Sequence, residues 1–348
     1  MRNPGGRAQR AKKQHYVPRF YLRYFAHDGS HFYACDTFDG RSYGTRVEDV
    51  ASASYFYDAP LDADTSTPGD RDPMQTLERR LADLEASASS ALDALVNGIE
   101  RNKAIDRSVR PEVARFLAVQ VLRTQEARIT SSQLWERGLA ALRREPLAPS
   151  LEAWLAQADR PDGAAITQAH LLLDGSVVQT IADALLGHVW IVGLNGTSTP
   201  LWTSDHPVVR KAHMHDPLVG TSGLASPGIE IDFPLSPTMV LILAERTYHA
   251  DIARLDGKTM ALISDSVTYL NAQQAAQCYR HVYASNDDFG LLRRIRKERP
   301  DLFRPDRDRV DVVAPGPPPD ALSEGLRTRS WLAIRKWVYR LPRKSGPQ

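Results

Sequence analysis

The sequence is poor in cysteine and has no long apolar run. Its 348 residues include two cysteines, Cys35 and Cys278, too few for a disulfide framework or a cysteine-rich metal site. No stretch of about 18 consecutive apolar residues occurs, so no membrane-spanning helix is predicted. The basic N-terminus is not followed by the apolar region that a secretory signal needs. A reducing cytoplasm is therefore the expected compartment.

Several common catalytic and cofactor-binding motifs are also missing. There is no Walker loop, no GxGxxG that opens a helix, no CxxC pair and no HExxH. His213-Met214-His215-Asp216 places metal-ligand side chains close together, but this loop arrangement is more often incidental, and we assign no metal to it. The sequence leaves any cofactor unidentified.

What is present is an ordinary globular composition with an uneven charge distribution. Hydrophobic residues make up 42% of the chain and charged residues 25%, as in soluble globular proteins. The net charge of +2 is composed of +5 in residues 1–13, +6 in residues 321–348 and −9 in between. An acidic body with two basic ends argues against a nucleic-acid groove through the body, unless a local patch provides one.

The segment Gln14–Phe25 concentrates five aromatic residues, two arginines and a histidine. Each aromatic side chain buries on the order of 150–250 Å² when it packs. The segment is therefore expected to dock onto the rest of the protein and to carry His15, Arg19 and Arg23 with it. Pro18 restricts the residue before it to extended geometry, which predicts a short extended entry at residues 15–17.

The periodicity of the chain predicts one large α+β domain over residues 14–295, with central helices and antiparallel strands near the N-terminus and in 188–244. Asp39-Gly40 and Asn195-Gly196 indicate hairpin turns. The other expected segments are a basic leader at 1–13, a helix beginning at Asp72-Pro73, helices at 111–129, within 131–187 and at 266–283, strands at 188–194, 200–203, 229–233 and 239–244, a charged and proline-rich linker at 296–320, and a basic amphipathic helix at 321–348.

Three short motifs carry a family resemblance. They are His15-Tyr16-Val17-Pro18 at the start, Thr203-Ser204-Asp205 followed by Pro207, and Phe233-Pro234-Leu235-Ser236-Pro237. With further matches over about residues 14–285, the chain resembles the bacterial proteins grouped as domain of unknown function 4238. The resemblance implies a shared fold and brings no agreed activity.

Several polar residues lie on the apolar faces of the expected helices, where sequence rules fail mostly at functional sites. Gln120 and Arg123 lie on or beside the packing face of the 111–129 helix, and Asn271 lies within that of the last helix. His15 can exchange protons near neutral pH, and Arg123 suits a phosphate or carboxylate. Asp205 could orient His15, act as a base, or bind a divalent cation with Glu85. The candidate site residues are thus His15, Gln120, Arg123, Asp205, Asn271 and Glu85, with Arg19 and His206 next.

Two classes of function remain open. One is an enzyme, a hydrolase acting on a phosphate-bearing small molecule or a nucleic acid through a His/Arg/Asp pocket. The other is a non-enzymatic binding or interaction module whose polar residues hold the fold together. The helix at 321–348 would suit either an anionic surface or packing on the body or another subunit. A shared, solvent-open pocket would favour the enzyme, and dry, satisfied hydrogen bonds would favour the module.

Overall fold

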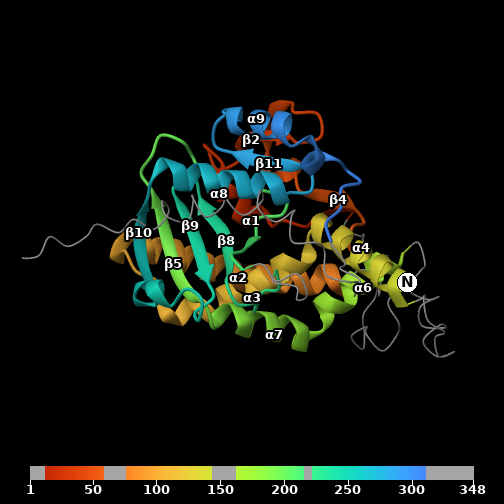
Figure 1. Cartoon of the computed structure of the whole chain (residues 1–348), viewed down its shortest axis with the longest axis horizontal. Helices are drawn as coiled ribbons and strands as arrows, with labels where there is room; N and C mark the ends of the chain where they lie inside the picture. Colours follow the sequence, from red (N-terminus) through yellow and green to blue (C-terminus); the bar gives the residue numbers. More distant parts are fainter. Residues whose placement is uncertain (1–11, 59–75, 143–161, 215–221, 311–348) are drawn as a thin grey trace, which may run out of the picture.

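The computed structural model describes residues 12–58, 76–142, 162–214 and 222–310 (Figure 1). Residues 1–11 of the predicted leader, the helix start at Asp72-Pro73, the second half of the His213–Asp216 loop, and the tail at 321–348 lie outside the described residues. Lys13, the last residue of the predicted leader, is instead the first residue of a strand.

The described chain is α+β, as the sequence predicts. Its α-helices are α1 (Arg19–Leu22), α2 (Thr76–Asn102), α3 (Arg110–Arg123), α4 (Gln125–Leu142), α6 (Gly163–Leu173), α7 (Gly175–Leu186), α8 (Ser264–Gln277) and α9 (Gly290–Glu298). Its strands are β1 (Lys13–His15), β2 (His31–Asp36), β3 (Ser42–Arg46), β4 (Ser52–Ser54), β5 (Val189–Asn195), β6 (Thr203–Ser204), β7 (Val209–Ala212), β8 (Ile229–Ser236), β9 (Met239–Ala244), β10 (Lys258–Leu262) and β11 (His281–Ala284).

The larger sheet has five strands in the order β10-β5-β9-β8-β7, all antiparallel except the parallel β10–β5 pair. Its two faces are both covered. Alternate residues of β9 such as Val240 pack with Val267 and Leu270 of α8, and the residues between them, such as Leu241, join the core with α2, α3 and α7. Burial of both faces explains why β9 is an uninterrupted apolar run, whereas the buried Glu230 and Asp232 interrupt the apolar sequence of β8.

The smaller sheet has the order β3-β2-β11-β6 and lies at the end of the molecule opposite α2, α3 and α7 (Figure 1). The β2–β3 hairpin expected at Asp39-Gly40 forms, and Gly40 takes the positive φ of +82° that its turn needs. On one face, Cys35 and Val282 pack against α9. On the other face, Phe32 and Tyr283 join the main core, so both sheets share one core.

The prediction of a hairpin at Asn195-Gly196 is wrong, because the strands on its two sides do not pair with each other. β5 pairs with β9 and β10, and β6 pairs with β11 in the other sheet. The Asn195 side chain instead organises a local loop, because its amide donates to the carbonyls of Thr199 and Pro237 and its oxygen accepts from Thr197 N–H. An Asx loop of this kind uses the same residue type as a hairpin turn.

Two helix predictions need correction. The helix expected over 111–129 is interrupted at Thr124, whose ψ is 163° and whose hydroxyl accepts from Ala127 N–H at the start of α4. The helix expected over 266–283 ends at Gln277 because Cys278 is extended, with ψ of 157°, and strand β11 follows.

The expected domain boundary at residue 295/296 falls inside α9. Beyond it, the described chain stays in contact with the body up to residue 310, where Arg307 and Arg309 reach Glu126 of α4. No single described helix is both long and apolar enough to cross a bilayer; α6 and α7 reach that length only together, and a 68° bend separates them.

Candidate functional site

The N-terminal segment docks as its aromatic content predicts. β1 pairs with β4, and Tyr21 of α1 reaches the junction of the two sheets. There the Tyr21 hydroxyl donates to Pro234 O at 2.8 Å and contacts Thr203 Oγ1 at 2.7 Å, while its ring stacks on Phe233 at 4.7 Å. Two of the three motifs that carry the family resemblance therefore meet at Tyr21, which lies three residues after the first motif.

Arg123 is buried and fastens this segment to the helices. One guanidinium nitrogen, Nη2, donates to His15 O at 2.8 Å and to Glu85 Oε1 at 2.7 Å, and Nε donates to the Tyr57 hydroxyl at 3.1 Å. Its Nη1 has no hydrogen-bond partner among the described residues. The structure thus brings His15, Glu85 and Arg123 together, but through the backbone of His15 and not through its imidazole.

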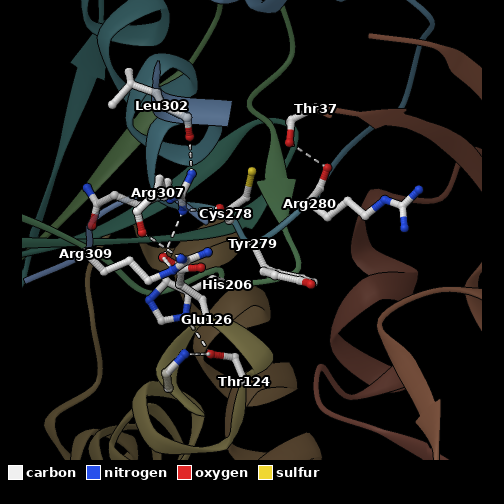
Figure 2. A network of polar contacts seen from close by, with 12 residues as sticks. Thr37, Thr124, Glu126, His206, Cys278, Tyr279, Arg280, Leu302, Arg307 and Arg309 are labelled. Carbon is white, nitrogen blue, oxygen red and sulfur yellow. Dashed lines mark hydrogen bonds and ion pairs between the residues drawn. The ribbon is translucent and has the colours of Figure 1, made fainter. Parts of the chain in front are cut away.

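Gln120 and Thr124 extend the same arrangement from the end of α3. Gln120 donates to Tyr16 O at 3.0 Å, and the Thr124 hydroxyl lies 2.7 Å from Nδ1 of His206 (Figure 2). Burial lowers the pKa of His206 to about 3, so the ring is neutral near pH 7. These bonds connect the His15–Pro18 motif with the turn after β6.

Asn271 has a different place. Its side-chain oxygen accepts from Trp202 N–H at 2.8 Å, and its amide donates to Pro200 O at 2.9 Å. Both ends of the side chain are occupied by backbone, and the residue is fully buried. Asn271 therefore holds the strand that leads into β6 against α8.

Asp205 is fully buried, and its carboxylate binds backbone N–H groups at the start of β11. Its two carboxylate oxygens accept from the N–H groups of Tyr279, Arg280 and His281, each at 2.8 Å. Burial raises the pKa of Asp205 to about 7, although the three donors act in the opposite direction. The carboxyl group therefore fixes the start of β11 and titrates near neutral pH.

His281 lies between two carboxylates. Its Nδ1 is 3.9 Å from Asp205 Oδ2, and its Nε2 is 3.9 Å from Asp36 Oδ2 on the neighbouring strand. The side chain is 22% exposed, whereas those of Asp36 and Asp205 are 7% and 0% exposed. Neither distance is a hydrogen bond, so within the described residues both ring nitrogens are available to solvent or a ligand.

Burial lowers the pKa of His281, and the charge of Asp36 partly offsets this effect. The imidazole is consequently neutral at physiological pH and can accept a proton. Beside it, Arg280 donates from Nε and Nη2 to Asp36 Oδ2 at 2.9 and 2.7 Å, and its side chain is 45% exposed. An accessible base and an accessible guanidinium thus share one carboxylate.

Phenol groups complete the surroundings of Asp205 and His281. Tyr16 and Tyr283 both lie within electrostatic range of Asp205, and Tyr43 lies within range of Tyr283. Burial raises the pKa of all three phenols. The Tyr283 hydroxyl is buried and has no hydrogen-bond partner among the described residues.

The remaining candidates contribute less. His15 donates from Nε2 to Glu48 O at 3.2 Å, and burial lowers its pKa to about 4. No contact in the described chain joins its ring to Asp205. Arg19 is exposed. No group of three or more His, Cys, Asp or Glu side chains among the described residues could hold a metal ion.

The sequence analysis selected Asp205 but missed His281, Asp36 and Tyr283. The sequence analysis placed His281 and Tyr283 at the end of the 266–283 helix. It therefore did not predict that His281 lies opposite Asp36 in a sheet. In β11 they alternate with the buried residues Val282 and Ala284 and face Asp36 and Ala34 of β2. The period-two pattern of residues 281–284 was the available signal.

A second polar network lies beside the turn after β6 (Figure 2). Arg307 and Arg309 both donate to Glu126 Oε1, at 2.8 and 3.0 Å, and Arg307 also donates to Cys278 O at 2.6 Å. The two guanidinium groups therefore hold α4 and the segment before β11 together.

The fold and this site define an α+β protein with a histidine, two carboxylates and phenols at the junction of its sheets. The chain belongs to the family described as protein of unknown function DUF4238, whose model matches residues 13–288. Comparison with curated proteins and with solved structures gives no match.

Proposed function

We propose that the protein is an acid–base enzyme, a hydrolase that acts on a phosphate-bearing substrate at the site around His281. The observation that supports this most is the position of the His281 imidazole, which is partly exposed, free of hydrogen bonds in the described chain, and 3.9 Å from a carboxylate on each side. Of the residues selected from the sequence, Asp205 remains in the proposed site, and His281 takes the role of base that was expected of His15.

In this proposal the neutral ring of His281 accepts a proton from water as the water attacks phosphorus. The nearby carboxylates of Asp36 and Asp205 stabilise the imidazolium that forms. Arg280 binds the non-bridging phosphate oxygens, because its guanidinium is exposed and beside the base. The proton on His281 then passes to the leaving oxygen or to solvent.

The test is hydrolysis of a panel of phosphomonoesters, phosphodiesters, nucleotides and short oligonucleotides by the purified chain. The variant His281→Asn is expected to lose at least about 100-fold in kcat, the lower range for a positioned general base. His31→Asn is the matched control, because His31 is half-exposed and pairs with Asp28 at the far end of the β2–β3 hairpin. Equal losses in both variants, or no turnover of any substrate by the wild type, would contradict the proposal.

A non-enzymatic interaction module is the second candidate, and one observation favours it. Gln120, Arg123 and Asn271 are buried, and each bonds to backbone carbonyl or amide groups. Their role in this candidate is to hold the fold. Binding of a partner that persists in His281→Asn, without hydrolysis by the wild type, would select it.

We infer a reducing compartment, the cytoplasm, for either function. Both cysteines are free and buried, and neither contributes a disulfide to the described fold.

A further inference from the structure

Helix α9 has an exposed basic face on the side of the smaller sheet opposite His281. Arg293, Arg294 and Lys297 are exposed, and none forms an ion pair with another described residue. Within the helix only Glu298 opposes them. In a body whose net charge is negative, these three side chains form the kind of local basic patch that a polyanion would bind.

The patch is joined to the site through the turn after β2. Arg296 of α9 donates to Thr37 O at 3.1 Å and to Phe38 O at 2.7 Å. The same turn bonds to Arg280, whose carbonyl accepts from Thr37 N–H at 2.7 Å and whose guanidinium lies over the Phe38 ring. Arg280 therefore lies at the end of the smaller sheet, beside the turn that α9 contacts, whereas His281 shares the face of Tyr283 on the side of the sheet away from α9.

Aromatic side chains surround this turn. Phe38 packs edge-on against Tyr279, with ring centroids 5.6 Å apart, and both rings are partly exposed. Tyr43, on β3, is 44% exposed. Unpaired bases stack on such rings without regard to sequence, and each stacked base contributes on the order of 1–3 kcal/mol.

A membrane surface would need a free apolar face on α9. Leu292, however, is buried against Cys35 and Phe289, so the apolar face of this helix is already used in packing. The cations are left without an apolar partner surface, which favours a soluble polyanion over a lipid headgroup layer.

We propose that α9 and the turn after β2 bind single-stranded nucleic acid, with phosphates on Arg293, Arg294 and Lys297 and bases on the ring cluster. Arg280, which lies at the end of the sheet and bonds to Asp36, then contacts the strand where it passes to the face that carries His281. This inference deepens the proposed function and rests on it for hydrolysis of the strand, whereas binding is tested on its own. In hydrolysis, the oxygen of water bonds to phosphorus, the bond from phosphorus to one ester oxygen breaks, and that oxygen leaves with a proton.

The test is fluorescence anisotropy of a labelled single-stranded oligonucleotide with the full chain, over a range of salt concentrations. Arg293→Gln/Arg294→Gln/Lys297→Gln is expected to weaken binding at least about tenfold and to lower the slope of log K against log salt by about 2, since three phosphate contacts are lost. The matched control is Arg101→Gln/Arg107→Gln/Lys258→Gln, three exposed cations away from α9, which should bind as the wild type does. His281→Asn should also bind as the wild type does.

Equal binding by the α9 variant and the wild type would overturn the inference, as would binding to phosphatidylserine vesicles but not to the oligonucleotide. Hydrolysis of small phosphoesters without oligonucleotide binding would overturn it and leave the proposed function standing. Oligonucleotide binding that depends on α9, without any hydrolysis, would support the surface and contradict the proposed function.

Discussion

Arg123 and His281 illustrate how burial separates structural residues from candidate catalytic ones. Arg123 was a candidate site residue from the sequence, whereas His281 was found only in the structure. The Arg123 side chain is 1% exposed and occupied by backbone, a carboxylate and a phenol. The ring of His281 is partly exposed, and its nitrogens are free of bonds within the described chain. Only the second arrangement leaves atoms that a substrate can reach.

The first prediction concerns Arg123. Arg123→Ala is expected to lower the free energy of unfolding by about 3 kcal/mol, because the buried Tyr57 hydroxyl, the His15 carbonyl and the partly exposed Glu85 lose their common partner. Chemical denaturation measures this. Arg115→Ala, an exposed position on the same helix, should change the free energy by less than about 0.5 kcal/mol. A fully stable Arg123→Ala protein would show that the guanidinium does not fasten the N-terminal segment.

The second prediction concerns the pH dependence set by His206. Its pKa is about 3 in the folded protein and 6.5 when unfolded, so the unfolded state binds the proton more readily. The stability contributed by the neutral ring is present above pH 6.5 and is lost as the pH falls. Relative to His206→Gln, the wild type should lose about 3 kcal/mol of unfolding free energy between pH 6.5 and pH 4.

Denaturation curves at both pH values measure this difference. The neighbouring Asp205 has the opposite sign, since its raised pKa makes stability fall as the pH rises toward 7. Because the wild type and His206→Gln both retain Asp205, the difference between their unfolding free energies does not contain the contribution of Asp205. Parallel pH profiles for His206→Gln and the wild type would mean that the ring is not buried in its neutral form.

At the scale of elements, the interruption of expected helices creates the site. A single helix over 111–129 would not place Thr124 opposite His206, and a helix reaching Tyr283 would remove the strand that carries His281. Tertiary contacts set the ends of α3 and α8. The Thr124–His206 hydrogen bond follows the end of α3, and the three N–H groups that donate to Asp205 follow the end of α8. The hydrophobic periodicity of a helix does not depend on partners that are distant in sequence, so these helix boundaries could not be predicted from it.

The third prediction concerns the segment after α9. Arg307→Ala is expected to lower the unfolding free energy by about 3 kcal/mol, because Glu126 and the Cys278 carbonyl lose a buried donor. Arg304→Ala is the control, since Arg304 is exposed and pairs with Asp306 two residues away. Deletion of residues 314–348, which lie outside the described residues, should shift the Tm by no more than a few degrees.

Equal effects of Arg304→Ala and Arg307→Ala would contradict the role assigned to the Glu126 contacts. A large loss of Tm on deletion of 314–348 would instead mean that the tail docks on the body.

At the scale of the whole molecule, the sequence predicts the class of fold and the docking of the N-terminal segment. The alternation in 31–36 and the Asp39-Gly40 turn specify the β2–β3 hairpin locally. The pairing of β11 with β2 and β6 joins residues more than 70 positions apart. Such pairings depend on the complete core, so the sequence could identify Asp205 but not the histidine beside it.

The central claim is that His281 is the base of a hydrolytic site at the junction of the two sheets. The most direct measurement is the single-turnover cleavage of a labelled single-stranded oligonucleotide by saturating amounts of wild type and His281→Asn. The wild type is expected to cleave the strand, and the variant to bind it equally well and to cleave it at least about 100-fold more slowly. Cleavage by His281→Asn at the wild-type rate would contradict the claim.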